Sequence, residues 1–427
     1  MKPGPRSAAG LRPSFPGRRH ALCCTLGLAV GLFTGLVPGA ARAQPRLTSR
    51  CLGPVPESLR AAPLVDEALD GLDPARLTDV HAHLLGTGDS GSGCSVSPEL
   101  YQWWRPLEVL RRRTILGAVC IDEAAGGIDR AYVARLHALA DDFPAGSRWW
   151  LFAFDQAHDD DGRPAPQWTT FHVPDAYAQA VAGAAPQRFS WVASVHPYRD
   201  DAVARVRQAR QGGAVALKWL PSTQNIDLRD ARCRALYPEL ARLGLPLIVH
   251  CGEEKAAPGA RRDDLNNPLL LREPLAAGAT VIAAHCASLG RARDLDRGGR
   301  AGGPRVAAFD LFARLMDEPG HRGTLLGDLS ALFQRNRRPA VWRAVLERSD
   351  WHGRLLHGSD HPLPGVTPLY ATAAFVREGL LDAADEAPLQ ALRDHNPLLF
   401  DLVLKRRLRL GAQRLPASVF EGRALAA

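Results

Sequence analysis

Short apolar runs alternate with longer amphipathic stretches over most of this chain. Several of the runs are separated by stretches with helical periodicity, such as Asp201–Gln211 and Ala231–Leu243. Strands that alternate with helices predict a parallel sheet, and this many units favour a closed (β/α)₈ barrel, a TIM barrel of the α/β class with loop insertions. Nine apolar runs have the length and composition of strands: Leu77–His81, Thr114–Ile121, Trp149–Phe154, Phe189–Val195, Ala214–Leu220, Leu247–Cys251, Thr280–Cys286, Thr324–Leu329 and Arg354–Gly358.

These nine runs exceed the eight strands of such a barrel by one. We expect Trp149–Phe154 to be the surplus run, because it opens a polar, Asp-rich insertion at His158–His172. The barrel is then expected over residues 77–404. An irregular lead-in at residues 44–76 precedes it, and a basic C-terminal tail at residues 405–427 follows it.

Residues 1–43 have the layout of a signal peptide. A basic stretch precedes the apolar run Ala21–Val37, and Ala41-Arg42-Ala43 offers a cleavage site with small outer residues. The pair Arg18-Arg19 directly before the apolar run is similar to a twin-arginine signal. We therefore expect a periplasmic or secreted protein without stable membrane insertion after cleavage. The alternative is a protein anchored in the membrane by an uncleaved N-terminal segment.

Composition and charge are those of a globular enzyme. Of the 427 residues, 46% are hydrophobic and 23% are charged, which suffices for a sizeable core. The net charge of +8 does not indicate nucleic-acid binding, because many arginines lie near the termini, as in Lys405–Arg409, and no recognition motif accompanies them. The sequence has neither a phosphate-binding loop nor a G-x-S-x-G nucleophile motif.

The eight cysteines do not form a disulfide scaffold in a chain of this length. Cys120, Cys251 and Cys286 lie in apolar runs and are expected to be small core residues. Cys51 and Cys94 lie in loop-like segments, where an exported protein could join them, and the sequence leaves that pairing open.

Candidate metal ligands stand where the apolar runs end. The first run ends in Asp-Val-His81-Ala-His83, and side chains two apart on a strand point to one face, so both histidines are expected to project into the barrel mouth. Imidazole is a good ligand for zinc and related divalent metals. Later runs end in His250, His285 and Asp360. Because a histidine buried without a partner costs free energy, this recurrence predicts one shared metal site.

Lys218 lies inside an apolar strand, from which lysine is normally excluded. Three interpretations remain open. Its ammonium group could pair with a substrate carboxylate or with Asp360; it could be carbamylated and bridge two metals; or it could extend to solvent.

Other polar residues near the strand ends are weaker candidates. Glu253 follows His250 at a loop where substrate contacts are expected, and His196 and Arg199 follow another strand and could line the pocket. Asp328 and Ser330 stand where the seventh strand should end.

Together these motifs resemble the amidohydrolase superfamily, and more closely its amidohydrolase 2 branch of metal-dependent hydrolases and aromatic-acid decarboxylases. The resemblance covers most of the chain from Asp79 to about Phe400. It rests on Asp79-Val-His81-Ala-His83, Lys218, Pro246-Leu-Ile-Val-His250, Ala284-His285, Gly358-Ser-Asp360-His-Pro362 and Asn396-Pro-Leu-Leu-Phe400.

The resemblance implies that His81, His83, His250 and Asp360 bind a single divalent metal, most often zinc. His285 would polarise the substrate or join a second metal, for which Lys218 is the other candidate ligand. Asp360 would take the proton from the water that the metal activates. His285 or Lys218 would then stabilise the developing oxyanion.

Three functions are consistent with these residues. The first is hydrolysis of a C–N or C–O bond of a small molecule, an amide, lactone or ester, by a metal-activated water. The second is non-oxidative decarboxylation of a small aromatic or unsaturated acid at the same site. Two metals bridged by Lys218 would favour hydrolysis, whereas one metal and a cationic clamp such as Arg199 would favour decarboxylation. The third is a periplasmic binding barrel without catalysis. The partner is in each case a small molecule, and homo-oligomerisation is left open.

Overall fold

The computed structural model describes residues 46–298, 303–422 and 425. The expected signal peptide, residues 1–43, lies outside these described residues. None of the helices in the described ranges combines the length and the apolar character that a membrane crossing requires.

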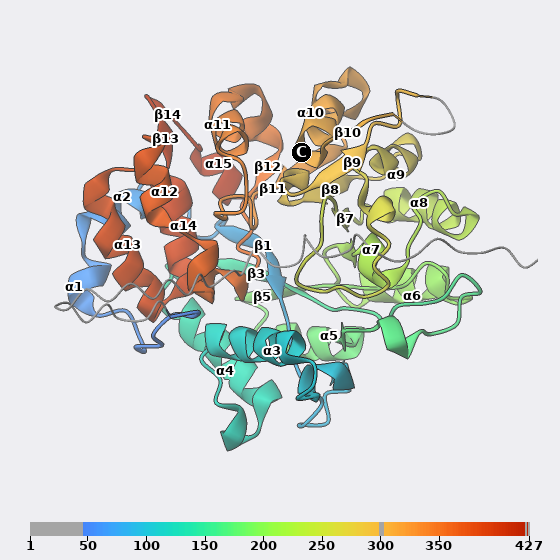
Figure 1. Ribbon diagram of the computed structural model, residues 1–427, viewed down its shortest axis with the longest axis horizontal. Helices are drawn as coiled ribbons and strands as arrows, with labels where there is room; N and C mark the ends of the chain where they lie inside the picture. Colours follow the sequence, from blue (N-terminus) through green and yellow to red (C-terminus); the bar gives the residue numbers. More distant parts are fainter. Residues whose placement is uncertain (1–45, 299–302, 423–424, 426–427) are drawn as a thin grey trace, which may run out of the picture. The chain divides into compact units, whose positions relative to one another are not determined.

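Eight parallel strands form the centre of the fold (Figure 1). Their ladders run in the order β1-β3-β5 and β12-β11-β8-β7-β6. A parallel bridge between Ala193 and Leu217 joins β5 to β6, and another between Ala82 and His361 joins β1 to the chain after β12. These bridges close the ring, which confirms the predicted barrel. The strands are β1 (Thr78–His83), β3 (Arg148–Phe152), β5 (Phe189–Val192), β6 (Leu217–Trp219), β7 (Leu247–His250), β8 (Val281–Ala284), β11 (Leu325–Asp328) and β12 (Leu355–Leu356).

One predicted strand was wrong, and the run taken as surplus is a barrel strand. Trp149–Phe154 contains β3, which pairs with both β1 and β5. The run Thr114–Ile121 instead lies mostly in helix α3 (Pro106–Ala118). A short apolar run does not distinguish a strand from the buried face of a helix, and α3 begins eight residues before the run.

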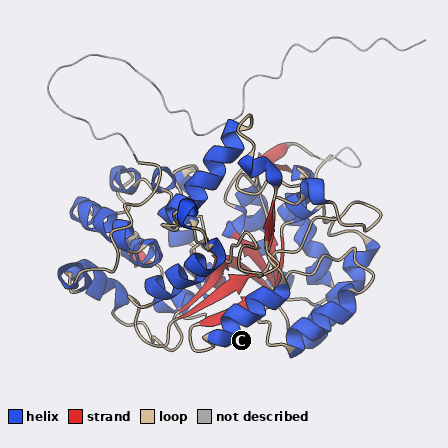
Figure 2. Ribbon diagram, turned by 90° about the horizontal axis from the view of Figure 1, so that it is seen from below, coloured by secondary structure: helices blue, strands red, loops and turns tan. Residues whose placement is uncertain are grey.

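Helices surround the strands (Figure 2). Each barrel strand is followed by at least one helix before the next barrel strand begins. The helices between or after them are α3, α4 (Ile128–Ala140), α5 (Asp175–Ala184), α6 (Ala202–Gln211), α7 (Pro221–Gln224), α8 (Ala231–Leu243), α9 (Arg272–Ala276), α10 (Ala308–Asp317), α11 (Pro339–Glu347), α12 (Thr372–Arg377), α13 (Ala383–His395), α14 (Pro397–Arg407) and α15 (Ala417–Phe420).

Three antiparallel pairs of short strands lie outside the barrel. They are β2 (Ser95–Val96) with β4 (Phe171–His172), β9 (Arg291–Arg293) with β10 (Arg305–Ala307), and β13 (Arg409–Leu410) with β14 (Gln413–Arg414). The first two pairs are loop insertions between barrel strands, as the sequence predicted.

Both ends of the described chain are folded against the barrel. The lead-in contains α1 (Glu57–Arg60) and α2 (Pro63–Leu69), and α2 packs on α14. In the segment expected to be a basic tail, Lys405 is fully buried, and its Nζ lies 2.5 Å from Asp401 Oδ2 and 2.6 Å from the Gly358 carbonyl oxygen. The folded part therefore continues beyond residue 404.

The barrel interior is an apolar layer with a polar layer next to it. Every barrel strand, or the residue just before it, contributes to the apolar layer: Val80, Trp150, Phe152, Val192, Ala216, Ile248, Ile282, Ala284, Leu326 and Leu356. Two residues after three of these stand Lys218, His250 and Asp328. Since alternate residues share a face, these three point into the barrel at the carboxyl ends of their strands.

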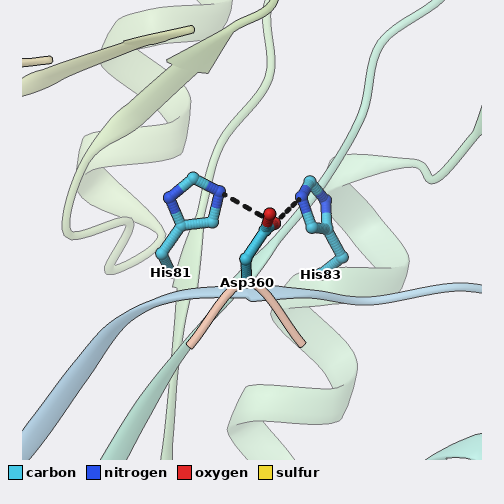
Figure 3. A group of neighbouring side chains, drawn as sticks. All are labelled: His81, His83 and Asp360. Carbon is cyan, nitrogen blue, oxygen red and sulfur yellow. Dashed lines mark ion pairs between the residues drawn. The ribbon is translucent and has the colours of Figure 1, made fainter. Parts of the chain in front are cut away.

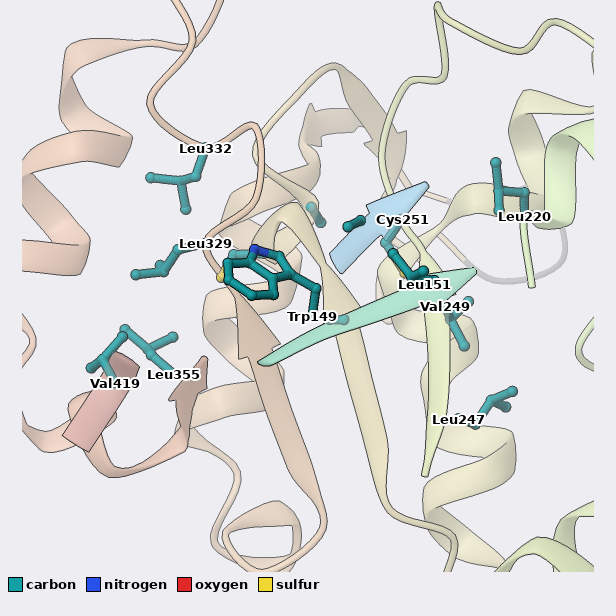
Figure 4. Close-up of a cluster of buried hydrophobic side chains, with 14 of the residues drawn as sticks. Trp149, Leu151, Leu220, Leu247, Val249, Cys251, Leu329, Leu332, Leu355 and Val419 are labelled. Atoms are coloured by element: carbon teal, nitrogen blue, oxygen red, sulfur yellow. The ribbon is translucent and has the colours of Figure 1, made fainter. Parts of the chain in front are cut away.

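Side chains on the outer faces of the strands pack against the helices in a second, larger core (Figure 4). Leu247 and Val249 of β7 belong to it, and they alternate with the inward-facing residues of that strand. This alternation shows why the strand runs are apolar throughout, since each strand of a parallel barrel is buried on both faces.

The structure resolves the cysteine pairing that the sequence left open, and the partner of Cys51 is not Cys94. Cys51 forms a disulfide with Cys120, with 5.6 Å between the Cα atoms, and Cys94 is a free, buried thiol. Cys120 was predicted to be a core residue only because its run was taken as a strand. It follows the end of α3 in a left-handed conformation, close to the lead-in.

Candidate metal centre

An extra residue in β1 directs two histidines to the barrel mouth. The register of β1 against β3 shifts between Asp79 and Ala82. Val80 faces the apolar interior, so strict alternation would point His81 outward. The bulge resets the alternation, and the side chains of both His81 and His83 then converge on one carboxylate (Figure 3).

That carboxylate is Asp360, which follows β12. Its Oδ1 lies 3.1 Å from His83 Nε2 and 3.5 Å from His81 Nε2. Asp360 has a left-handed backbone, with φ of 59°, and its amide donates to the His81 carbonyl oxygen at 2.8 Å. Such strain in a residue other than glycine is typical of functional sites, where the surrounding contacts hold it.

His285 and His250 complete a cluster of imidazoles. The ring centroid of His285 lies 4.9 Å from that of His81 and 5.1 Å from that of His250. His285 follows β8 in a run of three left-handed residues that extends to Ala287. This run turns the His285 ring toward the cluster although the preceding Ala284 already faces the interior.

Each of these three histidines uses Nδ1 for a protein partner. His81 Nδ1 lies 2.9 Å from Asp328 Oδ2, and His250 Nδ1 lies 3.3 Å from Glu254 Oε2. His285 Nδ1 lies 3.0 Å from the Ser330 carbonyl oxygen. Carboxylate and carbonyl oxygens accept hydrogen bonds, so Nδ1 carries the proton and Nε2 carries a lone pair. Nε2 of His81 and Nε2 of His250 are buried and make no hydrogen bond with the described residues.

The charges of the cluster favour a metal cation. Burial lowers the pKa of His81 to about 4 and lowers that of His250 as well, so both rings are neutral ligands at pH 7. Burial would raise the pKa of Asp360, but His285 and His83 hold it well below its usual range. The ligand atoms of His81, His83 and Asp360 lie within 4.8 Å of one another. Neutral imidazoles, one carboxylate and unpaired buried lone pairs fit a divalent metal.

Lys218 lies beside this cluster. It is 1% exposed, its Nζ makes no hydrogen bond with the described residues, and it lies 5.1 Å from the centroid of the Phe152 ring. Burial lowers its pKa to about 8, and Asp328 and Asp360 oppose that effect. Because Nζ is buried, the interpretation in which Lys218 extends to solvent is excluded. No ion pair between Lys218 and Asp360 forms among the described residues, so pairing with a substrate carboxylate and carbamylation remain open.

Two of the predicted substrate residues have other partners. His196 Nε2 lies 2.8 Å from the Gln224 carbonyl oxygen, and His196 Nδ1 accepts from the Tyr198 amide at 3.1 Å. Both ring nitrogens are thus used within the fold. Arg199 pairs with Asp201 at 3.0 Å and with Asp155 at 3.7 Å, so its charge is already matched.

Glu253 lines a cavity of about 230 Å³ beside the end of β7. The other lining residues are Gly252, Asp263, Asn266, Gly290, Arg291, Ala292 and Arg305. None of the candidate metal ligands lines this cavity, and a substrate contact through Glu253 stays a prediction.

Asp328, Glu254 and Arg337 have larger parts in the site than their sequence context suggested. Asp328 was expected at the end of the seventh strand, and Glu254 directly follows the candidate Glu253. Each holds the Nδ1 of a histidine. Arg337 lies in the loop before α11, close to Arg335 and Arg338, and nothing in the sequence separates it from surface arginines. In the structure it is 8% exposed.

Several solved structures are similar to this chain. An uncharacterised TIM-barrel protein from Bordetella bronchiseptica matches with 17% identity and a TM-score of 0.45, over 70% of this chain and 91% of its own. A 2,6-dihydroxybenzoate decarboxylase from Rhizobium matches with 14% identity and a TM-score of 0.37, over 76% and 98%. An amidohydrolase II matches with 13% identity and a TM-score of 0.38, over 77% and 99%. No family model and no curated protein matches the chain.

Proposed function

We propose that the chain is a metal-dependent hydrolase that cleaves a C–N or C–O bond of a small amide, lactone or ester with an activated water. The observation that carries this proposal is the convergence of His81, His83 and Asp360, whose ligand atoms lie within 4.8 Å of one another. His250 joins the cluster beside the His285 ring, and its buried Nε2, like that of His81, makes no hydrogen bond with the described residues. We infer one divalent ion at His81, His83, His250 and Asp360, and zinc fits three imidazoles and a carboxylate best. Such an ion supplies Lewis acidity, which acidifies a water molecule and polarises a carbonyl group.

Side chains of the protein itself would transfer the proton and stabilise the developing charge. Asp360 is an ionised carboxylate at the centre of the site, so its Oδ1 can accept the proton of the attacking water and return it to the leaving group. His285 Nε2 carries a lone pair, because its Nδ1 donates to Ser330. A neutral His285 therefore suits a second metal or proton acceptance better than the oxyanion role. Lys218 is the remaining buried donor for a developing oxyanion.

The alternative reaction is non-oxidative decarboxylation of a small aromatic or unsaturated acid at the same centre. This reaction needs a cation that holds the carboxylate of the acid. Lys218 and Arg337 are buried cations without an acidic partner among the described ion pairs. One metal ion beside such cations is the arrangement expected of the decarboxylase, which therefore ranks directly after the hydrolase. A binding barrel that had lost catalysis is expected to lack a metal ligand, and none of the ligands that the resemblance implies is missing from the sequence.

We further propose that the protein acts in the periplasm or outside the cell. The sequence of residues 1–43 and the Cys51–Cys120 disulfide support export, because disulfides persist in oxidising compartments.

Metal analysis of the purified mature protein, combined with an activity panel, tests the proposed function. We expect about one divalent ion per chain and loss of that ion in His81→Ala. We expect Asp360→Asn to lower turnover of an amide, lactone or ester at least about a hundredfold. Stoichiometric metal with turnover only of aromatic acids would select the decarboxylase. A wild-type protein without stoichiometric metal would contradict both reactions.

A further inference from the structure

Arg337 is a buried cation whose partners are all neutral. Its Nε donates to Ser288 Oγ at 3.2 Å, and its Nη1 donates to Gln334 Oε1 at 2.8 Å and to Asn336 Oδ1 at 2.6 Å. Its Nη2 makes no hydrogen bond with the described residues, and no carboxylate in the described part of the chain forms an ion pair with it. A buried charge without a counter-charge costs free energy, so we expect such a residue to bind an anionic ligand when the protein functions.

Two further donors lie next to this guanidinium. Gln334 directs its Oε1 to Arg337, which leaves its Nε2 as a donor, and that atom is buried without a well-formed hydrogen bond. The hydroxyl of Tyr370 is buried as well. Burial raises the pKa of Tyr370, and a side-chain hydrogen bond with Gln334 and the charge of Arg337 oppose that rise, so the three side chains are neighbours. Because Gln334 interacts with the Tyr370 hydroxyl oxygen, the donors left for a ligand are the free edge of the Arg337 guanidinium and the Tyr370 O–H group.

These residues lie beside the candidate metal centre. Arg337 Nε donates to Ser288 Oγ at 3.2 Å, and the Ser288 amide donates to the His285 carbonyl oxygen at 2.9 Å, so one residue connects Arg337 to the histidine cluster. Burial lowers the pKa of Arg337 to about 10, and Asp360 leads the charges that oppose this effect. Arg337 in turn lowers the pKa of His250. The loops that carry the donors are tied together, because the Arg335 amide donates to the Leu369 carbonyl oxygen at 2.6 Å.

We propose that Arg337, Gln334 and Tyr370 form a subsite that binds a carboxylate group of the substrate beside the candidate metal centre. This inference rests on the proposed function and narrows it, because it makes the substrate a small carboxylic acid or an amide, lactone or ester that carries one. The free edge of a guanidinium and neighbouring neutral donors suit the two oxygens of a carboxylate.

The opposite case within this chain is Arg393, which is also buried and also lacks an ion pair among the described residues. Arg393 donates to the carbonyl oxygen of Tyr370 at 3.0 Å and lies over the Phe400 ring at 5.1 Å. Arg393 therefore has a structural role: it holds the backbone at Tyr370 and packs against the core at Phe400. The hydrogen-bond partners of Arg337 are all neutral side chains, and the charge of Asp360 acts on its pKa. We therefore assign the ligand to Arg337.

The test is calorimetric titration of the full-length, metal-loaded protein with acetate, benzoate and oxalate, each compared with acetamide, benzamide or oxamide. Inorganic phosphate is titrated in parallel, and metal content is measured in every sample. The variants are Arg337→Met, Arg337→Lys and Tyr370→Phe. Arg199→Met is the matched control, because it removes a partly buried arginine near another strand end.

We expect at least one acid to bind at least about tenfold more tightly than its amide. We expect Arg337→Met to weaken the binding of that acid at least about tenfold and Tyr370→Phe to weaken it about fivefold. The effect of Arg337→Lys should lie in between, and the metal content of all three variants should be unchanged. Arg199→Met should leave the affinity unchanged. Tyr370→Phe removes a single hydroxyl group, so its effect on acid affinity tests the subsite if Arg337→Met does not fold.

Three results would overturn the subsite: no acid binds better than its amide, acid affinity is unchanged in the folded variants, or phosphate binds more tightly than every acid. The two proposals fail separately. If the metal-loaded protein binds the acids equally tightly with and without the Arg337 side chain, only the subsite is contradicted. A protein without metal that still shows Arg337-dependent acid binding contradicts the hydrolase only.

Discussion

At the residue scale, the candidate centre depends on hydrogen bonds that leave one nitrogen of each ring free. Asp328 makes one of these hydrogen bonds: it is 0% exposed and holds His81 Nδ1 at 2.9 Å. It also accepts from the His285 amide at 3.0 Å. One carboxylate therefore positions two histidines from different strands.

We predict that Asp328→Asn lowers metal affinity about ten- to a hundredfold, because groups that orient metal ligands typically contribute that much. The measurement is competition for zinc with a chelating dye. Asp385→Asn serves as the control, since Asp385 is a buried carboxylate that pairs with Arg407 at 2.8 Å instead. Equal metal affinity in Asp328→Asn and the wild type would show that Asp328 does not position His81.

The candidate ligands were predictable because they follow apolar strands in the sequence. Arg337 was not, since its role depends on burial that a loop sequence does not reveal. Arg199 was chosen as the cationic clamp from its place after a strand, but Asp201 and Asp155 already neutralise it. Loop residues are positioned by long-range contacts, which the local pattern of a sequence does not contain.

At the scale of elements, the closure between β1 and the chain after β12 positions His81. A Cβ atom on Gly358 would lie 2.7 Å from His81 Cβ, so only glycine allows this approach. Through this contact, the bulge in β1 packs directly against the residues that precede Asp360.

We predict that Gly358→Ala displaces His81 and reduces bound metal at least about tenfold, with destabilisation of about 1–3 kcal/mol from overpacking. Gly353→Ala is the control, because a Cβ there meets no atom within 4 Å. Metal content and urea unfolding are measured on both. A Gly358→Ala protein with full metal content would contradict the role of this contact.

The loop after β1 depends on another buried carboxylate, Asp129 of α4. Asp129 accepts from the Thr87 amide at 2.6 Å, from Ser90 Oγ at 3.0 Å and from Ser92 Oγ at 2.5 Å. Burial raises the pKa of Asp129, but these hydrogen bonds together lower it below its usual value of 3.8. The ionised form is thus favoured in the folded state.

We predict that Asp129→Asn lowers the free energy of unfolding by about 3 kcal/mol at neutral pH, because hydrogen bonds to the charge are lost. A lowered pKa contributes stability that is complete above 3.8 and disappears as the pH falls through the folded pKa. The difference between wild type and variant should therefore narrow below about pH 4. Urea unfolding measured from pH 7 to pH 3 checks this, and a difference that grows toward acid would contradict it.

The alternation of strands and helices was sufficient to predict the barrel, because both periodicities are local. It was not sufficient to choose between Trp149–Phe154 and Thr114–Ile121, since partner strands decide which apolar run joins the sheet. The bulge in β1 was also hidden, although the predicted direction of His81 and His83 holds because of it.

At the scale of the whole molecule, the Cys51–Cys120 disulfide ties the lead-in to the segment after α3. It closes a loop with a sequence separation of 69 residues. We predict that Cys51→Ser with Cys120→Ser lowers the free energy of unfolding by about 2–4 kcal/mol. Urea unfolding of the oxidised wild type and the double variant checks this, with Cys94→Ser as a control for a buried free thiol. Equal midpoints for wild type and double variant would contradict it.

The central claim is that strand ends from around the barrel hold one divalent metal. Anomalous diffraction from crystals of the purified protein, collected on both sides of the zinc absorption edge, tests it most directly. We predict one strong peak about 2.0–2.2 Å from the Nε2 atoms of His81, His83 and His250 and from a carboxylate oxygen of Asp360. A metal-loaded protein whose peak lies away from these four residues, or whose crystals show no peak, would contradict the account.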